Sequence, residues 1–189
     1  MNDNAPEIEV YVRLAHADDD EFILSLANRF AEFELPAWRK RSETLAGIRR
    51  DIEHHLRTLP PASHLFVAES EVELGDSRER ASQGGRAANA PGKVQEEAYE
   101  RLGFLHLQTR KDFFTGALNC HIADLVVAAG HEGRGVAGAM LRYAEEWAKE
   151  HRCRFLTLGV FPNNERARRL YEQHGFGVEI LSMAKPVGQ

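Results

Sequence analysis

Apolar residues follow two different periods along this chain of 189 residues. Six stretches are typical of β-strands, namely 9–16, a run that begins at His64, 101–110, 120–129, 154–161 and 177–187. Four stretches are typical of amphipathic helices, namely 18–33, 41–59, 136–151 and 162–176. The order β-α-α-β-β-β-α-β-α-β predicts an α/β (α+β) fold with a mixed, mostly antiparallel sheet and helices on both faces.

Several local signals refine these elements. Ser42 is expected to cap the second helix, and Gly175 follows the last turn of the fourth helix, where a left-handed backbone is common. The strands 101–110 and 120–129 are predicted to be antiparallel neighbours. The third helix carries one stripe of core-facing residues at helical spacing: Val136, Met140, Tyr143 and Trp147.

The segment 72–100 interrupts this regular pattern. It is rich in Gly, Ala, Ser and charged residues and has few large apolar side chains, so it buries too little surface to order itself. We therefore expect one domain over 1–189 with a flexible insertion between two strands. The insertion is either a loop without a function of its own or a lid over a substrate.

Charge and composition narrow the class of protein. The net charge of -5 provides no global basic field for nucleic acid, although a local basic patch stays possible. The first ten residues lack the pattern of a signal peptide, and no run approaches the roughly 18 apolar residues of a membrane span. Cys120 and Cys153 lack CxxC spacing, which favours two reduced thiols. These features predict a cytoplasmic protein with no nucleic-acid or membrane partner.

A glycine-rich loop carries the strongest chemical signal. Gly133, Gly135 and Gly138 spell G-x-G-x-x-G after a predicted strand and at the start of a helix, which matches the dinucleotide fingerprint. That fold would need more chain than the roughly 50 residues that follow. The acidic residue expected about 20 positions later is also absent. The preceding strands look antiparallel as well, so a nicotinamide-dinucleotide site is the weaker interpretation.

The stretch 122–176 resembles the GCN5-related N-acetyltransferase (GNAT) family. The family's loop [QR]-x-x-G-x-[GA] corresponds to residues 132–137, with Glu132 in place of Gln or Arg. A second motif, N-x-x-A-x-x-x-Y-x-x-x-G-F, matches on a later element, with its residues at Asn164, Ala167, Tyr171, Gly175 and Phe176. The resemblance implies the acyl-CoA N-acyltransferase fold, acetyl-CoA as co-substrate and an amine as acceptor.

Physical reasoning supports an anion site at this loop. Main-chain N–H groups at a helix N-terminus are unpaired, and glycines let a diphosphate approach them. A carboxylate would repel a diphosphate, so Glu132 is predicted to turn outward, and Arg134, two residues later, could supply the missing cation. The family resemblance further implies that the pantetheine arm pairs with the main chain of the strand 124–127, opposite 157–160, and that the second motif touches the cofactor. The candidate cofactor-binding residues are therefore Leu125, Val126, Val127, Gly133, Arg134, Gly135, Val136, Ala137, Gly138, Asn164 and Ala167.

The resemblance also suggests catalytic roles. Tyr171 matches the general acid that protonates the departing thiolate, although a tyrosine that only packs in the core is an alternative. Asp124 occupies a strand position where many relatives carry a carboxylate, and it would orient the amine or accept its proton through water. A structural hydrogen bond is the alternative for Asp124, and Asn164 is equally consistent with a plain helix cap.

The expected function is direct transfer of an acetyl group from acetyl-CoA to a primary amine. A small-molecule acceptor is favoured because the two N-terminal helices would enclose the site, and a protein amine is the alternative. A non-catalytic CoA-binding or regulatory module is a second possibility, because Glu132 departs from the motif. No HExxH pattern follows His131, so no metal site is expected. The resemblance also suggests a homodimer.

Overall fold

The computed structural model describes residues 8–72 and 98–187, and one five-stranded sheet organises them. The strands lie side by side in chain order: β1 (Tyr11–Leu14), β2 (Ser63–Glu71), β3 (Tyr99–Lys111), β4 (Leu118–Val127) and β5 (Leu156–Leu158). The pairs from β1 to β4 are antiparallel, and β5 is parallel to β4. The predicted mixed, mostly antiparallel sheet is therefore confirmed.

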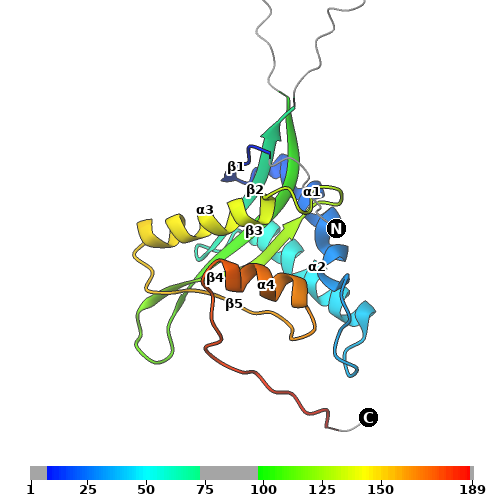
Figure 1. Ribbon diagram of the computed structural model, residues 1–189, viewed down its shortest axis with the longest axis vertical. Helices are drawn as coiled ribbons and strands as arrows, with labels where there is room; N and C mark the ends of the chain where they lie inside the picture. The colour runs from blue at the N-terminus through cyan, green and yellow to red at the C-terminus, as the bar shows by residue number, and fades with distance from the viewer. Residues whose placement is uncertain (1–7, 73–97, 188–189) are drawn as a thin grey trace, which may run out of the picture.

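Helices cover both faces of the sheet (Figure 1). One face packs against α1 (Asp20–Ser25), the 3₁₀ helix η2 (Leu26–Ala31) and α2 (Arg41–Thr58). The other face packs against α3 (Val136–Glu150), and side chains of α4 (Glu165–Gln173) join the same core. We call these the α2 face and the α3 face. Because strand side chains alternate, neighbouring residues such as Phe104 and Leu105 contribute to different faces.

The two faces have separate apolar cores. On the α2 face, fully buried Ile23 and Ile52 from the helices meet Val67 and Phe104 from the strands. On the α3 face, the predicted stripe of α3 is confirmed, with its members packed against Leu105 and Leu107 of β3. The sheet is thus buried from both sides, which leaves its edges and strand ends as the places where a ligand can reach the main chain.

Four local expectations were wrong. The predicted helix 18–33 is divided into η1 (Ala17–Asp19), α1 and η2, and the tighter 3₁₀ turns still bury Leu26 and Ala31. Lys40, not Ser42, is the N-cap of α2. The fifth strand is three residues long, and no strand forms over 177–187. A strand pattern needs a neighbour with free backbone groups, and β5 is too short to supply one for that length.

The predicted insertion leaves the sheet from a β-hairpin. The N–H of Val72 donates to the carbonyl of Ala98 at 2.7 Å, so the two ends of the segment lie together. Tyr99 and Glu100, which the sequence assigned to the insertion, are the first residues of β3. Residues 73–97 lie outside the described part of the chain, so the lid interpretation stays a prediction.

Candidate active site

The sheet has an open edge in the second half of β4. β5 pairs with β4 only where Leu156–Leu158 lies beside Cys120–Ile122, whereas β4 continues to Val127. Among the described strands, none borders residues 124–127 on that side, so alternate N–H and C=O groups of Leu125, Val126 and Val127 face a gap. The sequence placed 157–160 opposite 124–127, but Thr157 pairs with His121 instead. The two strands separate before Asp124.

The glycine loop lies directly after this open edge. Gly130, Gly133 and Gly135 have φ values of 85, 77 and 85°, which only glycine adopts without strain. Gly135 is the N-cap of α3, and no side chain caps the helix. Within the described chain, no oxygen accepts a hydrogen bond from the N–H of Gly133 or Gly135, or from Arg134 between them. A Cβ at Gly133 would meet no atom within 4 Å. The loop therefore presents unpaired donors to open space, as a diphosphate requires.

Glu132 was predicted to turn outward, but the structure holds its carboxylate in contacts within the protein. Its carboxylate bonds to the Arg29 guanidinium of η2 and accepts the N–H of Gly130 at 2.8 Å. Arg29 also lies 3.1 Å from Glu32. Partial burial alone would raise the pKa of Glu132, but the main-chain N–H groups and the Arg29 guanidinium lower it below its usual value. The residue that departs from the family motif thus ties the glycine loop to the helical layer of the α2 face.

The other predicted cofactor residues lie around the same helix ends. Arg134 is beside His131 at 3.4 Å, within the loop. A Cβ at Gly138 would approach His174 Nε2 to 3.3 Å, so this glycine lets the end of α4 approach α3. Asn164 is the N-cap of α4, and its side chain accepts the N–H of Ala167 at 3.2 Å. The cap interpretation of Asn164 is therefore confirmed, and its amide group is still able to donate to a ligand.

Tyr171 lies on α4, with its ring 5.9 Å from that of Phe176, and it packs against the core of the α3 face. Burial raises the pKa of its phenol above the usual value near 10. The hydroxyl therefore keeps its proton at neutral pH and is available as a hydrogen-bond donor. The packing and the donor role are compatible, because a tyrosine can bury its ring and present its hydroxyl.

Asp124 belongs to a buried polar network on the α2 face that the sequence did not reveal. His106, which is fully buried on β3, lies 2.8 Å through Nδ1 from Asp124 Oδ2. Its Nε2 lies 2.6 Å from Ser63 Oγ and 3.3 Å from Gln108 Nε2. The Gln108 nitrogen also lies 3.2 Å from His55 Nε2 of α2. The structural alternative for Asp124, a hydrogen bond, is therefore real, but the bond occupies only one carboxylate oxygen.

The sequence does contain a signal for this network. His106 and Gln108 occupy the same phase of β3 as buried Phe104, so two polar side chains replace apolar ones in a strand that is buried on both faces. A buried polar group is retained only when hydrogen bonds compensate its lost hydration. That pattern identifies a polar site, although it cannot identify the partners.

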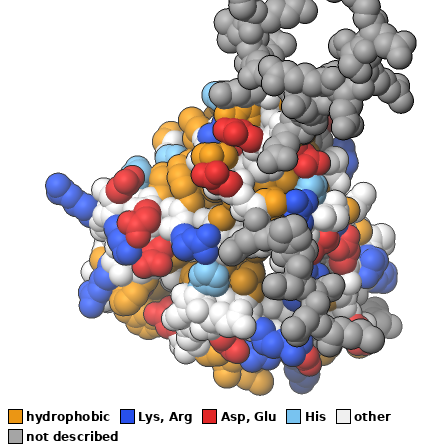
Figure 2. All heavy atoms as spheres, turned by 45° about the horizontal axis from the view of Figure 1, so that its top comes forward, with side chains coloured by type: hydrophobic (Ala, Val, Ile, Leu, Met, Phe, Trp, Pro, Cys, Tyr) orange, Lys and Arg blue, Asp and Glu red, His pale blue; other side chains and the backbone are white. Residues whose placement is uncertain are grey.

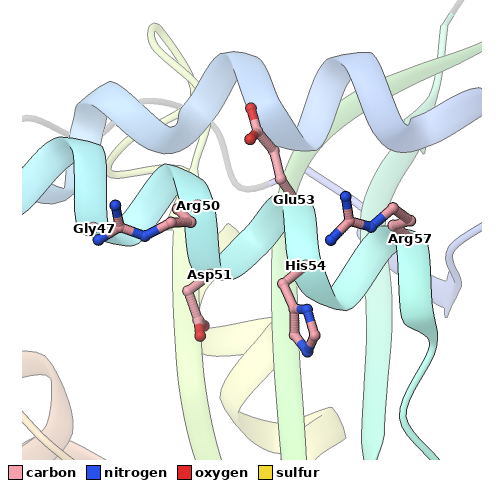
Figure 3. A pocket seen from close by; sticks show the side chains of 6 residues that line it. All are labelled: Gly47, Arg50, Asp51, Glu53, His54 and Arg57. Atoms are coloured by element: carbon pink, nitrogen blue, oxygen red, sulfur yellow. The ribbon is translucent and has the colours of Figure 1, made fainter.

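Two further surface features do not converge on a site. A depression on α2 is lined by residues of that helix alone: Gly47, Arg50, Asp51, Glu53, His54 and Arg57. Figure 3 shows the side chains of Glu53 and His54 pointing to opposite sides of the helix. On the face drawn in Figure 2, basic and acidic side chains are interspersed. Among the described residues, no cluster of His, Cys, Asp or Glu is arranged to hold a metal, and no helix there is long and apolar enough to cross a membrane.

Comparisons with known proteins agree with this geometry. The model of the Acetyltransferase (GNAT) family matches residues 61–176, which is more than half of the chain. Over 83 residues the chain is 30% identical to the uncharacterized N-acetyltransferase YhfO of Bacillus subtilis (strain 168), covering 44% of this chain and 56% of that protein. The chain thus spans little more than half the length of this curated relative.

Solved structures share the fold. A putative acetyl transferase from Pyrococcus furiosus has a TM-score of 0.64 at 24% identity, over 95% of this chain and 100% of that one. Ribosomal-protein-alanine N-acetyltransferase from Brucella melitensis has a TM-score of 0.60 at 20% identity, over 95% and 99% of the two chains. Aminoglycoside N-acetyltransferase AAC(6')-Iy in complex with CoA has a TM-score of 0.58 at 15% identity, over 94% and 95%. With the family match, the common fold and the glycine loop in agreement, the chain belongs to the GNAT family of acetyltransferases.

Proposed function

We propose that this protein transfers an acetyl group from acetyl-CoA directly to a primary amine, without a covalent enzyme intermediate. Two neighbouring stretches of unpaired main chain support this proposal most strongly. The open edge of β4 ends at Val127, and the free amides of Gly133–Gly135 follow within one short loop. A long ligand could pair an amide-containing arm with the edge of β4 and place its diphosphate on the loop amides.

Asp124 and Tyr171 would have complementary roles in the proposed reaction. Acetyl-CoA would supply the acyl group as a thioester. An alkylammonium, with a pKa near 10.4, must lose a proton before its nitrogen can attack. Asp124 would hold the ammonium and accept that proton, directly or through water. The Tyr171 hydroxyl would donate a hydrogen bond to the departing sulfur. Because its pKa is raised above that of a thiol, near 8.5, it stabilises the thiolate mainly as a donor.

We propose a small molecule as the acceptor. The segment after η2 reaches across the end of the sheet, where the Phe33 ring lies 5.7 Å from that of Phe161 and the Arg39 guanidinium lies 5.5 Å from the same ring. Phe161 follows β5, so these contacts link the segment after η2 to the segment that leaves β5, as enclosure of the site by the N-terminal helices would require. An enclosed site would favour a compact amine over a protein chain. A protein amine is the alternative outcome of an acceptor screen.

A homodimer also stays part of the proposal. Val178, Ile180, Leu181 and Met183 are exposed in the extended segment that follows α4, and a second copy would cover them. Sedimentation at micromolar concentration should give twice the monomer mass. A monomer at that concentration would contradict the dimer without affecting the proposed chemistry.

Two glycines provide a matched test of the cofactor site. Gly133 (φ +77°) and Gly116 (φ +69°), in the turn between β3 and β4, both have open space where a Cβ would be. Replacing either by valine imposes similar backbone strain, but only Gly133→Val obstructs the loop. Calorimetry with acetyl-CoA should show at least a tenfold, or about 1.4 kcal/mol, loss of affinity for Gly133→Val and little change for Gly116→Val.

Turnover distinguishes an enzyme from a binding module. Thiol release should be followed with acetyl-CoA and a panel of polyamines, amino acids, aminoglycosides and peptide amines. Release with one class identifies the acceptor. Tight acetyl-CoA binding without thiol release for any amine would favour the non-catalytic module, and the absence of binding would contradict both.

A further inference from the structure

The polar network beside Asp124 defines which ring nitrogen of each histidine carries a proton. Arg110 donates to Gln108 Oε1, which identifies the oxygen of that amide and fixes its orientation. The amide nitrogen, with two hydrogens, is then the atom shared by His55 Nε2 at 3.2 Å and His106 Nε2 at 3.3 Å. Both Nε2 atoms must therefore accept, which requires both imidazoles to be neutral with the proton on Nδ1.

The remaining contacts agree with this assignment. His55 Nδ1 lies 2.8 Å from the main-chain oxygen of Asp51, which can only accept. His106 Nδ1 lies 2.8 Å from Asp124 Oδ2, which as a carboxylate also only accepts. Ser63 Oγ, 2.6 Å from His106 Nε2, can donate its hydroxyl proton. Every hydrogen-bonding atom of the His106 ring is thus satisfied in one tautomer, and its full burial keeps competing water away.

A neutral donor has a specific consequence for Asp124. The bond from His106 Nδ1–H orients the carboxylate through Oδ2 without cancelling its charge. Within the described chain Oδ1 has no hydrogen-bond partner, and the Asp124 side chain is 12% exposed at the point where β4 parts from β5. The carboxylate can therefore offer a full negative charge and one free oxygen to a cation that enters the gap.

We propose that His106 is a positioning residue for the transfer. It holds the Asp124 carboxylate aimed at the ammonium group of the acceptor, while Ser63 and Gln108 fix the imidazole in the Nδ1–H tautomer. The inference rests on the proposed function and narrows the acceptor to an amine that arrives as a cation. His106 itself touches neither substrate, because it is buried behind Asp124.

Two substitutions separate the roles of the two ring nitrogens. In His106→Asn, the side-chain nitrogen takes the place of Nδ1 and can still donate to Asp124. In His106→Gln, the nitrogen takes the place of Nε2 and reaches Ser63 instead. With the acceptor found by thiol release, His106→Gln should lower kcat/KM for the amine about 10- to 100-fold, as expected for loss of a charge-assisted hydrogen bond. The KM for acetyl-CoA should stay unchanged, and His106→Asn should retain at least about five times the kcat/KM of His106→Gln.

Controls distinguish this role from a structural one. His64 lies on β2 with its ring 4.8 Å from Trp147 on the α3 face, so His64→Gln should leave the KM for the amine unchanged. Thermal unfolding shows whether each variant is folded at the assay temperature. Equal losses in His106→Asn and His106→Gln, or no loss in His106→Gln, would overturn the positioning role.

Nitrogen-15 NMR of the histidine rings tests the same inference without turnover. The His106 resonances should show a protonated Nδ1 and an unprotonated Nε2 in the wild-type protein, and Asp124→Asn should disturb that pattern. The opposite tautomer, or a doubly protonated ring at neutral pH, would overturn the inference even in an active enzyme. A wild-type protein that releases no thiol with any amine would instead contradict the proposed function.

Discussion

Asp19 and Asp124 are both largely withdrawn from solvent, but their partners differ. Asp19, 1% exposed, lies 2.7 Å from the Arg13 guanidinium and 2.8 Å from that of Arg101, and it accepts the N–H of His16 at 2.8 Å. Among the described residues, Asp124 has one side-chain partner, His106, which we infer to be a neutral donor. One carboxylate joins β1, η1 and β3, whereas the other lies at the open edge of β4.

The difference teaches which buried charge is available for chemistry. Two arginines saturate Asp19, so its charge stabilises the fold and has little left to offer a ligand. Asp124 keeps its charge and one free oxygen beside the gap that the parted strands create. We therefore expect the two residues to respond oppositely: Asp19 should govern unfolding, and Asp124 should govern turnover.

Asp19→Asn should have the largest effect on stability. The amide leaves two arginines without their shared carboxylate, and breaking a buried ion pair typically costs about 3 kcal/mol. Urea unfolding should show that loss in the free energy of unfolding, while kcat/KM per folded molecule is retained. A loss of turnover in the folded variant would break the distinction between the two carboxylates.

Asp124→Asn should produce the reverse pattern. Removing the negative charge should lower kcat/KM about 100-fold, which corresponds to about 2.7 kcal/mol of transition-state stabilisation. The free energy of unfolding should change by less than about 1 kcal/mol, because no buried cation loses its partner. If turnover falls only as far as the folded fraction does, Asp124 is a structural residue like Asp19.

Lowering the pH should reveal the contribution of Asp19 to the stability of the wild-type protein. Burial alone would raise the pKa of Asp19, but Arg13, the His16 N–H and Arg101 lower it from 3.8 to about 2. A lowered pKa stabilises the fold fully above the unfolded value, and this contribution is lost as pH falls through the folded value. Between about pH 4 and pH 2, roughly 2 kcal/mol should disappear. The Asp19→Asn variant should lack this component, and an identical acid transition in both proteins would contradict the assignment.

Much of the fold could be predicted from the sequence because its signals are local. The α3 stripe, the antiparallel β3–β4 pair and the positive φ of Gly175 each depend on residues close together in the chain. The prediction of a strand over 177–187 was wrong because strand pairing is not a local signal. Its alternation is present in the sequence, but a strand forms only where another strand supplies partners, and that depends on distant residues.

The candidate site also combines residues that the sequence identifies with contacts that it does not reveal. Gly133, Gly135, Asn164 and Tyr171 belong to contiguous motifs, so the sequence was sufficient to name them. The His106–Asp124 bond joins direct register partners on β3 and β4, next to a β-bulge after which Leu107 pairs with Ile122. A bulge shifts which residues share a face of the sheet, so residue spacing along the strands could not predict this contact. The Arg29–Glu132 pair spans 103 positions and was invisible for the same reason.

Glu132 is intermediate between the two aspartates in the number of its charged partners. Its substitution should have a smaller effect than that of either aspartate. It has one arginine partner and its side chain is 27% exposed, so Glu132→Gln should lower the free energy of unfolding by less than about 1 kcal/mol. Removing a negative charge beside the glycine loop should strengthen acetyl-CoA binding by about threefold in calorimetry at low salt. Glu43→Gln, which removes an exposed partner of Lys40 on α2, is the matched control and should change neither quantity. Weaker binding in Glu132→Gln would instead mean that Glu132 holds Arg29 where its positive charge helps to bind the diphosphate, so that the carboxylate acts through the arginine it positions.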